Sequence, residues 1–347
     1  MLSREVLLFF FDEQQPRRQK NIYNVLRGVS TVSNLFWAQQ YNLLDFWRYY
    51  PHLELNEYSQ IIREAIETGN LLKVGDNKLI RGANLEIVSS NVEHGLQSYF
   101  DFDKLIQLIE LAVQVVSELS FQNKFYSPSI DDMELLWQIK IWLNHVKTKD
   151  NISEFVAKFQ SELTVIGTNL PEENSVLLFN QFVGHKHVGL TTEQLSRALN
   201  IAAFEIDFRI RETFLEVINI VENKKLPLFS ALITPVQSSS KLTHSALISW
   251  NLFKNGTEIP KIASLRRIKE NTVREHLMMA AILEADFPFE KFIDLDLFLD
   301  EFDLNSKKPD EWTYQMVLQK DASVSFFSFR LAQIKQGQLN YLDKKRT

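Results

Sequence analysis

The sequence predicts a mostly α-helical chain of several domains, and three observations lead to this fold class. The length of 347 residues exceeds the usual size of one domain. Hydrophobic residues make up 45% of the chain, which is ample for folded cores. Glycine is scarce, with 10 residues, and this favours helices over sheets with tight turns and over phosphate-binding glycine loops.

The composition excludes several kinds of site. The chain has no cysteine, so disulfide bonds, thiolate metal sites and cysteine nucleophiles are excluded. The most apolar stretch, Leu105 to Val116, contains Glu110 and is far shorter than a membrane span. With no secretory signal pattern at the N-terminus, we expect a cytoplasmic protein without a membrane partner. The net charge of −6 means that any contact with nucleic acid must be local.

Residues 1–90 are expected to form a winged-helix-like domain. A helix from about Asn56 to Thr68 has apolar residues at the spacing of one buried face, and it stops at Gly69. The next stretch, Leu71 to Gly82, predicts two short strands joined by a tight turn. Helices followed by a hairpin have the chain order of a winged helix. The candidate wing contacts to DNA are Lys73, Lys78 and Arg81.

Residues 91–236 are expected to form a central helical bundle. The stretches Leu105 to Leu119 and Met133 to Val146 are amphipathic. Thr191 to Ile201 has the pattern of the first half of a helix-turn-helix, but the helix after it mixes acids with arginines. We therefore favour an ordinary helical pair there over a second DNA-reading motif. The polar stretch Gln237 to Ser240 then predicts a linker.

Residues 241–335 are expected to form a helix-turn-helix domain, followed by a tail at 336–347. The first helix, about Ser245 to Asn255, is ended by Gly256, and Thr257 is expected to cap the second helix, Glu258 to Leu265. Pro260 is tolerated because it falls in the first turn. The third helix starts near Lys269 and buries apolar residues spaced four apart, which are Val273, Leu277 and Ala281.

The N-terminal part of the third helix has the chemistry to read DNA. Its predicted outer face carries Asn271 and Arg274, whose side chains pair with adenine and guanine in the major groove. Other polar residues are better placed to bind phosphates, and they are Lys261, Arg266, Arg267, Lys269 and Thr272. Residues 241–282 contain seven Lys and Arg against three Glu, a net charge of +4 in an acidic chain.

An acidic belt follows directly, because residues 284–303 carry eight acids and only Lys291 as a base. This belt would repel phosphate, so we expect it to face away from DNA or to meet a basic partner protein.

Several motifs indicate a resemblance to a known family. The run from Trp250 to Gly256, continued by Ile262 and Ala263 and by Asn271 to Leu277, resembles the C-terminal helix-turn-helix domain of some RecQ helicases and of YpbB-like proteins. Further stretches that resemble the YpbB-like group are 18–27, 107–126 and 325–333. The resemblance implies a bacterial protein without a helicase motor that acts with a RecQ-like helicase in DNA repair or recombination. The chain departs from the pattern at Lys269, where a hydroxyl residue is usual, and in the turn, which lacks a glycine.

Other functional classes find less support. His185 and His187 have no Cys or nearby acid in sequence to complete a metal site, so we expect a polar loop and no bound metal. His276 lies beside the buried Leu277, which favours a packed or phosphate-adjacent histidine over a catalytic base. With no nucleotide-binding or nucleophile motif, we expect neither enzyme activity nor a cofactor. Two alternatives to the helicase accessory remain open, a helix-turn-helix transcriptional regulator and a protein-interaction scaffold that binds no DNA.

Overall fold

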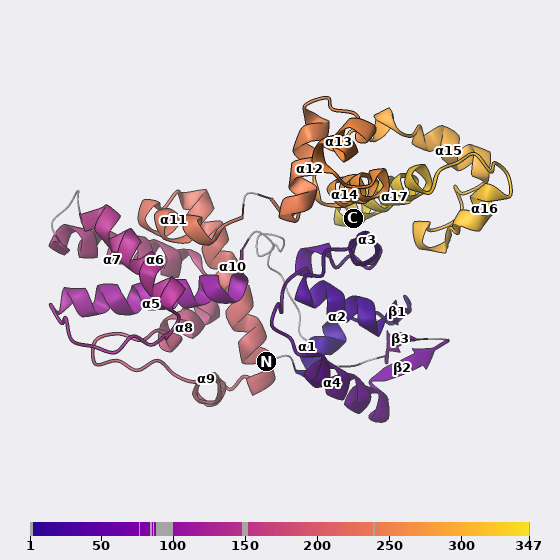
Figure 1. The fold of residues 1–347 in the computed structure, drawn as a ribbon. Helices are drawn as coiled ribbons and strands as arrows, with labels where there is room; N and C mark the ends of the chain where they lie inside the picture. The colour runs from indigo at the N-terminus through magenta and orange to yellow at the C-terminus, as the bar shows by residue number, and fades with distance from the viewer. Residues whose placement is uncertain are drawn as a thin grey trace. The chain divides into compact units, whose positions relative to one another are not determined.

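The computed structural model describes residues 3–75, 77–83, 85, 87, 100–147, 152–238 and 240–346. The chain is mostly helical with a small amount of β-structure, as the sequence predicted (Figure 1). It divides into two compact units, and each is described by itself below. Unit 1 comprises residues 1–16 and 49–239, and unit 2 comprises residues 17–48 and 240–347.

This division differs from the predicted domains 1–90, 91–236 and 241–335. Residues 17–48 belong with the C-terminal stretch because α3 (Val32–Gln40) places Leu35 and Phe36 in the same core as Trp250. Apolar spacing shows which face of a helix is buried, but it does not show which element covers that face. The boundary between residues 239 and 240 lies inside the polar stretch that predicted a linker. The predicted tail at 336–347 is instead the continuation of a long helix, α17 (Phe326–Arg346).

Unit 1 is a helical assembly with one β-hairpin. Its α5 packs against α6, α7 and α11, while the long α10 packs against α1, α7, α8, α9 and α11. The elements are α1 (Arg4–Phe9), α4 (Leu55–Glu67), β2 (Leu71–Val74), β3 (Lys78–Arg81), α5 (Phe102–Ser120), α6 (Met133–Lys147), α7 (Ile152–Asn169), α8 (Glu172–Gln181), α9 (Thr192–Leu199), α10 (Ala203–Lys224), α11 (Pro227–Ile233) and η3 (Thr234–Val236).

The predicted hairpin is confirmed. Strands β2 and β3 pair antiparallel, with Leu71 opposite Arg81 and Val74 opposite Lys78. Leu71 and Leu79 are buried, and β2 packs on α4, the helix that precedes it. The helix before the hairpin is therefore as expected, whereas α2 and α3, which also precede it in sequence, belong to unit 2.

The arginines of α10 are engaged within unit 1. Arg209 pairs with Glu205 at 2.7 Å, and Arg211 pairs with Asp103 at 2.7 Å and donates to the carbonyl oxygen of Tyr49. These guanidinium groups already have carboxylate partners, so they would contribute little attraction for phosphate. The arrangement agrees with the preferred interpretation of α9 and α10 as an ordinary helical pair.

Unit 2 is built around one central helix. Its α14 packs against α3, α12, α13 and α17, and α2 packs against α3 (Figure 1). The remaining elements are β1 (Arg17–Arg18), α2 (Gln19–Arg27), η1 (Leu44–Phe46), α12 (His244–Lys254), α13 (Ile259–Arg266), α14 (Glu270–Leu283), η4 (Phe289–Lys291), α15 (Leu295–Phe302), η5 (Pro309–Glu311) and α16 (Tyr314–Leu318).

The core of unit 2 contains a group of stacked aromatic rings. The ring of Trp250 lies 5.5 Å from that of Phe287, and Phe253 lies 5.5 Å from Phe292. These contacts fix α12 against the segment that follows α14. A second small core, which includes Phe298 and Trp312, holds α15 and α16 against α17.

Across the described ranges of both units, every helix is too short or too polar to span a lipid bilayer.

Candidate nucleic-acid interface

Three helices of unit 2, α12 to α14, have the connectivity of a helix-turn-helix. The Thr243 hydroxyl caps α12, and Gly256 turns the chain just after this helix with a φ of +84°. Pro260 lies in the first turn of α13, as predicted. The N-cap of α13 is Glu258 and not Thr257, because the chain stays extended for one residue more than the sequence indicated.

The turn between α13 and α14 is closed without a glycine. Arg267 takes the left-handed conformation there, with a φ of +53°, and its N–H donates to the Ser264 carbonyl at 3.2 Å. Lys269 is the N-cap of α14 and provides no side-chain cap. The first backbone N–H groups of α14 therefore receive no hydrogen bond acceptor from that side chain, which leaves a positively polarised helix end.

Helix α14 is exposed at one end and buried at the other. Glu270, Asn271 and Glu275 are exposed, whereas all residues from His276 to Ile282 are buried against neighbouring helices. Only the first turn and a half of α14 can therefore reach a ligand outside the unit. Its position matches the part of a recognition helix that meets base edges in a major groove.

Three of the predicted phosphate contacts are exposed cations around this end of α14. Lys261, Arg267 and Lys269 are all solvent-exposed, and none of them forms an ion pair with a residue that the structure describes. Thr272 is half-buried, and its N–H donates to the Lys269 carbonyl at 3.0 Å. The structure thus places the three exposed cations on α13, on the turn and at the start of α14.

Arg266 has a different role from the one the sequence indicated. Its guanidinium donates to the carbonyl oxygen of Ser245 at 2.7 Å and to the Ser245 hydroxyl at 2.9 Å, and it also contacts the Ser249 hydroxyl. Both serines lie on α12, and Ser249 is fully buried. Arg266 therefore ties the end of α13 to α12. The sequence offered no signal for these partners because they lie 21 and 17 residues earlier in the chain.

His276 completes this network inside the unit. Its Nδ1 lies 2.9 Å from the Ser249 hydroxyl and 3.3 Å from the Arg266 guanidinium. A guanidinium can only donate, so Nδ1 must act as an acceptor and the imidazole proton must sit on Nε2. Burial first, and the positive charge of Arg266 second, lower the pKa of His276 below its usual value. Of the two alternatives that the sequence left open, this geometry agrees with the packed histidine.

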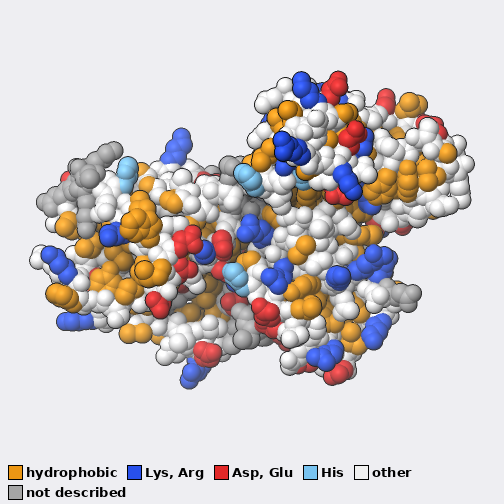
Figure 2. Space-filling view, in the orientation of Figure 1, with side chains coloured by type: hydrophobic (Ala, Val, Ile, Leu, Met, Phe, Trp, Pro, Cys, Tyr) orange, Lys and Arg blue, Asp and Glu red, His pale blue; other side chains and the backbone are white. Residues whose placement is uncertain are grey.

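The two predicted base-reading residues are brought together at the start of α14. Arg274 donates to the Asn271 side-chain oxygen at 3.1 Å and forms an ion pair with Glu270 at 2.9 Å. Because these groups are partly exposed, the pair contributes little energy and can exchange for an outside acceptor. Over α12 and α13, Figure 2 shows basic side chains interspersed with acidic ones, so the surface is not uniformly basic.

A hollow of about 670 Å³ lies beside Asn271 and Arg274. Its other walls come from Ile259 on α13 and from Phe292 and Phe326, which the sequence did not identify as neighbours of α14. Phe326 lies on α17, and no local sequence pattern indicates that α17 packs against α14.

The candidate wing residues lie in unit 1. Lys73 is exposed and Lys78 is half-buried. Arg81 instead forms an ion pair with Glu13 at 3.2 Å, and a second nitrogen of its guanidinium contacts the Leu8 carbonyl at 3.5 Å. Arg81 therefore holds the hairpin to the start of the chain, and this role replaces the predicted wing contact to DNA.

Part of the acidic belt serves unit 2 itself. Asp286 pairs with Lys254 at 2.8 Å, Asp294 caps α15, and Asp303 pairs with Lys320. These carboxylates stabilise helix ends and connections.

In unit 1, the loop with His185 and His187 also has an internal partner, since His185 lies 2.8 Å from Glu118, which is distant in sequence.

Comparisons with known proteins agree with this geometry. A family model described as a helix-turn-helix domain matches residues 245–333. The C-terminal region is a helix-turn-helix domain. Protein YpbB of Bacillus subtilis (strain 168) is 22% identical over 232 residues, which are 66% of this chain and 64% of that protein. The match thus spans less than two thirds of that relative. No solved structure matches.

The network around Arg266 predicts a loss of stability in an Arg266→Ala variant. Removal of the guanidinium leaves the oxygen of the buried Ser249 hydroxyl without its donor, at a cost of about 1–3 kcal/mol. Chemical denaturation should show this loss. Arg267→Ala is the matched control, and its exposed side chain predicts a change within about 0.5 kcal/mol. Equal stability of the two variants would show that Arg266 is not a structural residue.

The lowered pKa of His276 predicts that acid destabilises unit 2. The unfolded chain binds a proton near pH 6.5, whereas the folded unit resists protonation, so the stability falls as the pH drops from 7 through 6.5. Thermal denaturation between pH 7.5 and 5.5 measures this slope. In His276→Gln the slope should become shallower, while the exposed His187→Gln should leave it unchanged. A slope that is the same in all three proteins contradicts the role of His276.

Proposed function

We propose that this protein binds DNA through the exposed start of α14 and acts as an accessory to a RecQ-like helicase in DNA repair or recombination. The observation that carries DNA binding is the combination of an uncapped α14 with three exposed cations, Lys261, Arg267 and Lys269. Helix ends of this kind favour phosphate, and lysine and arginine position a protein on the DNA backbone.

Within this proposal, the residues of the interface divide by role. Arg267 and Lys269 contact phosphates beside the groove, and Asn271 and Arg274 face base edges. Arg274 gives up its weak pairing with Glu270 when a guanine provides two acceptors. Arg266 shapes the turn from within the unit. Binding alone is sufficient for this role, so we propose no reaction and no cofactor.

The helicase partnership rests on the resemblance of the helix-turn-helix run to the domain of RecQ helicases and YpbB-like proteins. Exposed acids of α15, such as Asp296 and Asp300, offer a negatively charged surface on the same unit. A basic partner protein would be attracted to that surface while DNA is repelled. The acidic and basic parts of unit 2 would then separate protein contact from DNA contact.

A double variant, Arg267→Ala with Lys269→Ala, tests the DNA interface. Each lost phosphate contact lowers the slope of log affinity against log salt by about 0.9, so we expect a slope about 1.8 units shallower and weaker binding at low salt. Fluorescence anisotropy with duplex, forked and single-stranded DNA across a salt series measures both quantities.

The matched control replaces Lys307 and Lys308, two exposed lysines of the same unit, with alanine. This control changes the net charge by the same amount but should retain the salt slope. If both double variants lose slope equally, the interface is not at α14. If neither loses affinity, the proposal of DNA binding through this surface is wrong.

The helicase partnership predicts faster unwinding of a forked duplex. A RecQ-family helicase should unwind more substrate per minute when the full chain is present than when it is absent. The Arg267→Ala, Lys269→Ala variant should stimulate less, because it holds the fork less tightly. An unchanged unwinding rate at saturating protein, with DNA binding intact, would contradict the partnership while leaving DNA binding in place.

A further inference from the structure

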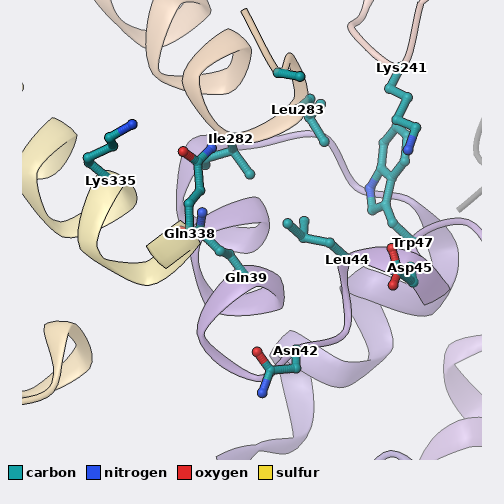
Figure 3. Close-up of a pocket in the computed structure, with 11 residues that line it drawn as sticks. Gln39, Asn42, Leu44, Asp45, Trp47, Lys241, Ile282, Leu283, Lys335 and Gln338 are labelled. Atoms are coloured by element: carbon teal, nitrogen blue, oxygen red, sulfur yellow. The ribbon is translucent and has the colours of Figure 1, made fainter. Parts of the chain in front are cut away.

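A pocket of about 390 Å³ lies in unit 2 at the buried end of α14, away from its exposed start. The residues that line it come from four places, the α3–η1 segment, the stretch before α12, the end of α14 and α17 (Figure 3). Its size falls within the range of sites that take small molecules. Its apolar walls include Leu44, Trp47, Ile282 and Leu283.

One polar atom in this pocket is buried without a partner. Trp47 is 4% exposed, and its Nε1 has no hydrogen bond acceptor among the residues that the structure describes. Figure 3 shows this nitrogen on the edge of the indole that faces Leu44 and Leu283 across the pocket. Buried indole N–H groups usually have an acceptor, and the group can only donate. The pocket therefore presents one directed requirement, for a hydrogen bond acceptor.

The pocket disfavours buried charge. Burial lowers the pKa of Lys241, and this effect exceeds the opposite effect of Asp45 and Glu284. The Lys335 amine lies 4.9 Å from the centre of the Phe289 ring. Figure 3 shows the two lysines on opposite sides of the pocket. An ionic ligand would lose its hydration in these surroundings, whereas an uncharged ligand would avoid that cost.

Two carboxamides on the pocket wall hold the helices together. Gln338 donates to the Ala281 carbonyl at 2.7 Å, and Gln39 donates to the Ile334 carbonyl at 3.2 Å. These bonds tie α17 to α14 and α3 to α17. The walls are therefore preformed. Asn42 also lines the pocket, but its exposed carboxamide can bond water, so the Trp47 N–H is the buried group that selects among apolar ligands.

We propose that this pocket binds a small uncharged molecule that has an apolar body and a carbonyl oxygen, which accepts a hydrogen bond from Trp47 Nε1. The site is independent of the DNA interface, and nothing in its chemistry requires that the chain bind DNA. The apolar body contacts Leu44, Ile282 and Leu283, and the carbonyl satisfies the buried donor.

The test uses acetophenone as a probe and the tryptophan side chains as reporters. The chain has six tryptophans, so the full-length protein labelled with ¹⁵N gives six indole N–H resonances. A Trp47→Phe variant assigns one of them. Titration with acetophenone should shift that resonance, and binding should be about fivefold tighter than for α-methylstyrene, in which a CH₂ group replaces the carbonyl oxygen. Benzoate, the charged counterpart, should also bind more weakly.

The Trp47→Phe variant keeps an aromatic body and should bind acetophenone about fivefold more weakly, as measured by saturation-transfer NMR. Trp137→Phe is the matched control, since Trp137 is an exposed residue of unit 1, and it should bind like the natural protein. An unshifted Trp47 resonance would mean that water alone satisfies the indole and would overturn the proposal. Equal affinity for acetophenone and α-methylstyrene, or a loss in Trp137→Phe, would overturn it as well.

Discussion

The burial of one half of α14 is the constraint on which unit 2 depends. From His276 onward the helix is enclosed by α3, α12 and α17, and this fixes the direction in which its first turn and a half projects. A helix that enters a DNA groove must be held rigidly, because a small tilt moves its side chains out of reach of the bases. Here apolar packing at one end of α14 provides the rigidity, and the exposed polar side chains are confined to the other end.

A polar network nearer the exposed end of α14 also joins this helix to its neighbours. Arg266, Ser249 and His276 join α12, α13 and α14 through hydrogen bonds, in which Arg266 donates, the Ser249 hydroxyl both accepts and donates, and His276 Nδ1 accepts. The neutral state of the histidine is part of this arrangement, since a second positive charge beside the guanidinium would be repelled. The turn therefore keeps its shape without the glycine that such a turn often contains.

The sequence predicted most of the local structure and less of the site. Gly256, Pro260 and the apolar residues spaced along α14 located three helices to within about a residue or two, because caps and periodicity are local signals. The partners of Arg266 and Arg81 were not predictable, since their acceptors come from other helices or from a distant part of the chain. For the same reason, the sequence predicted neither the placement of residues 17–48 in unit 2 nor the pocket at Trp47, whose walls come from several separate segments.

The discontinuity of unit 2 has a consequence for how the protein forms in the cell. Residues 49–239 lie between its two parts in sequence, so the ribosome must release all of them before α2 and α3 meet the helices that cover them. During that interval their apolar faces depend on temporary shielding, for example by chaperones. A shortened translation product would never assemble unit 2, so incomplete chains would lack the surface around the start of α14.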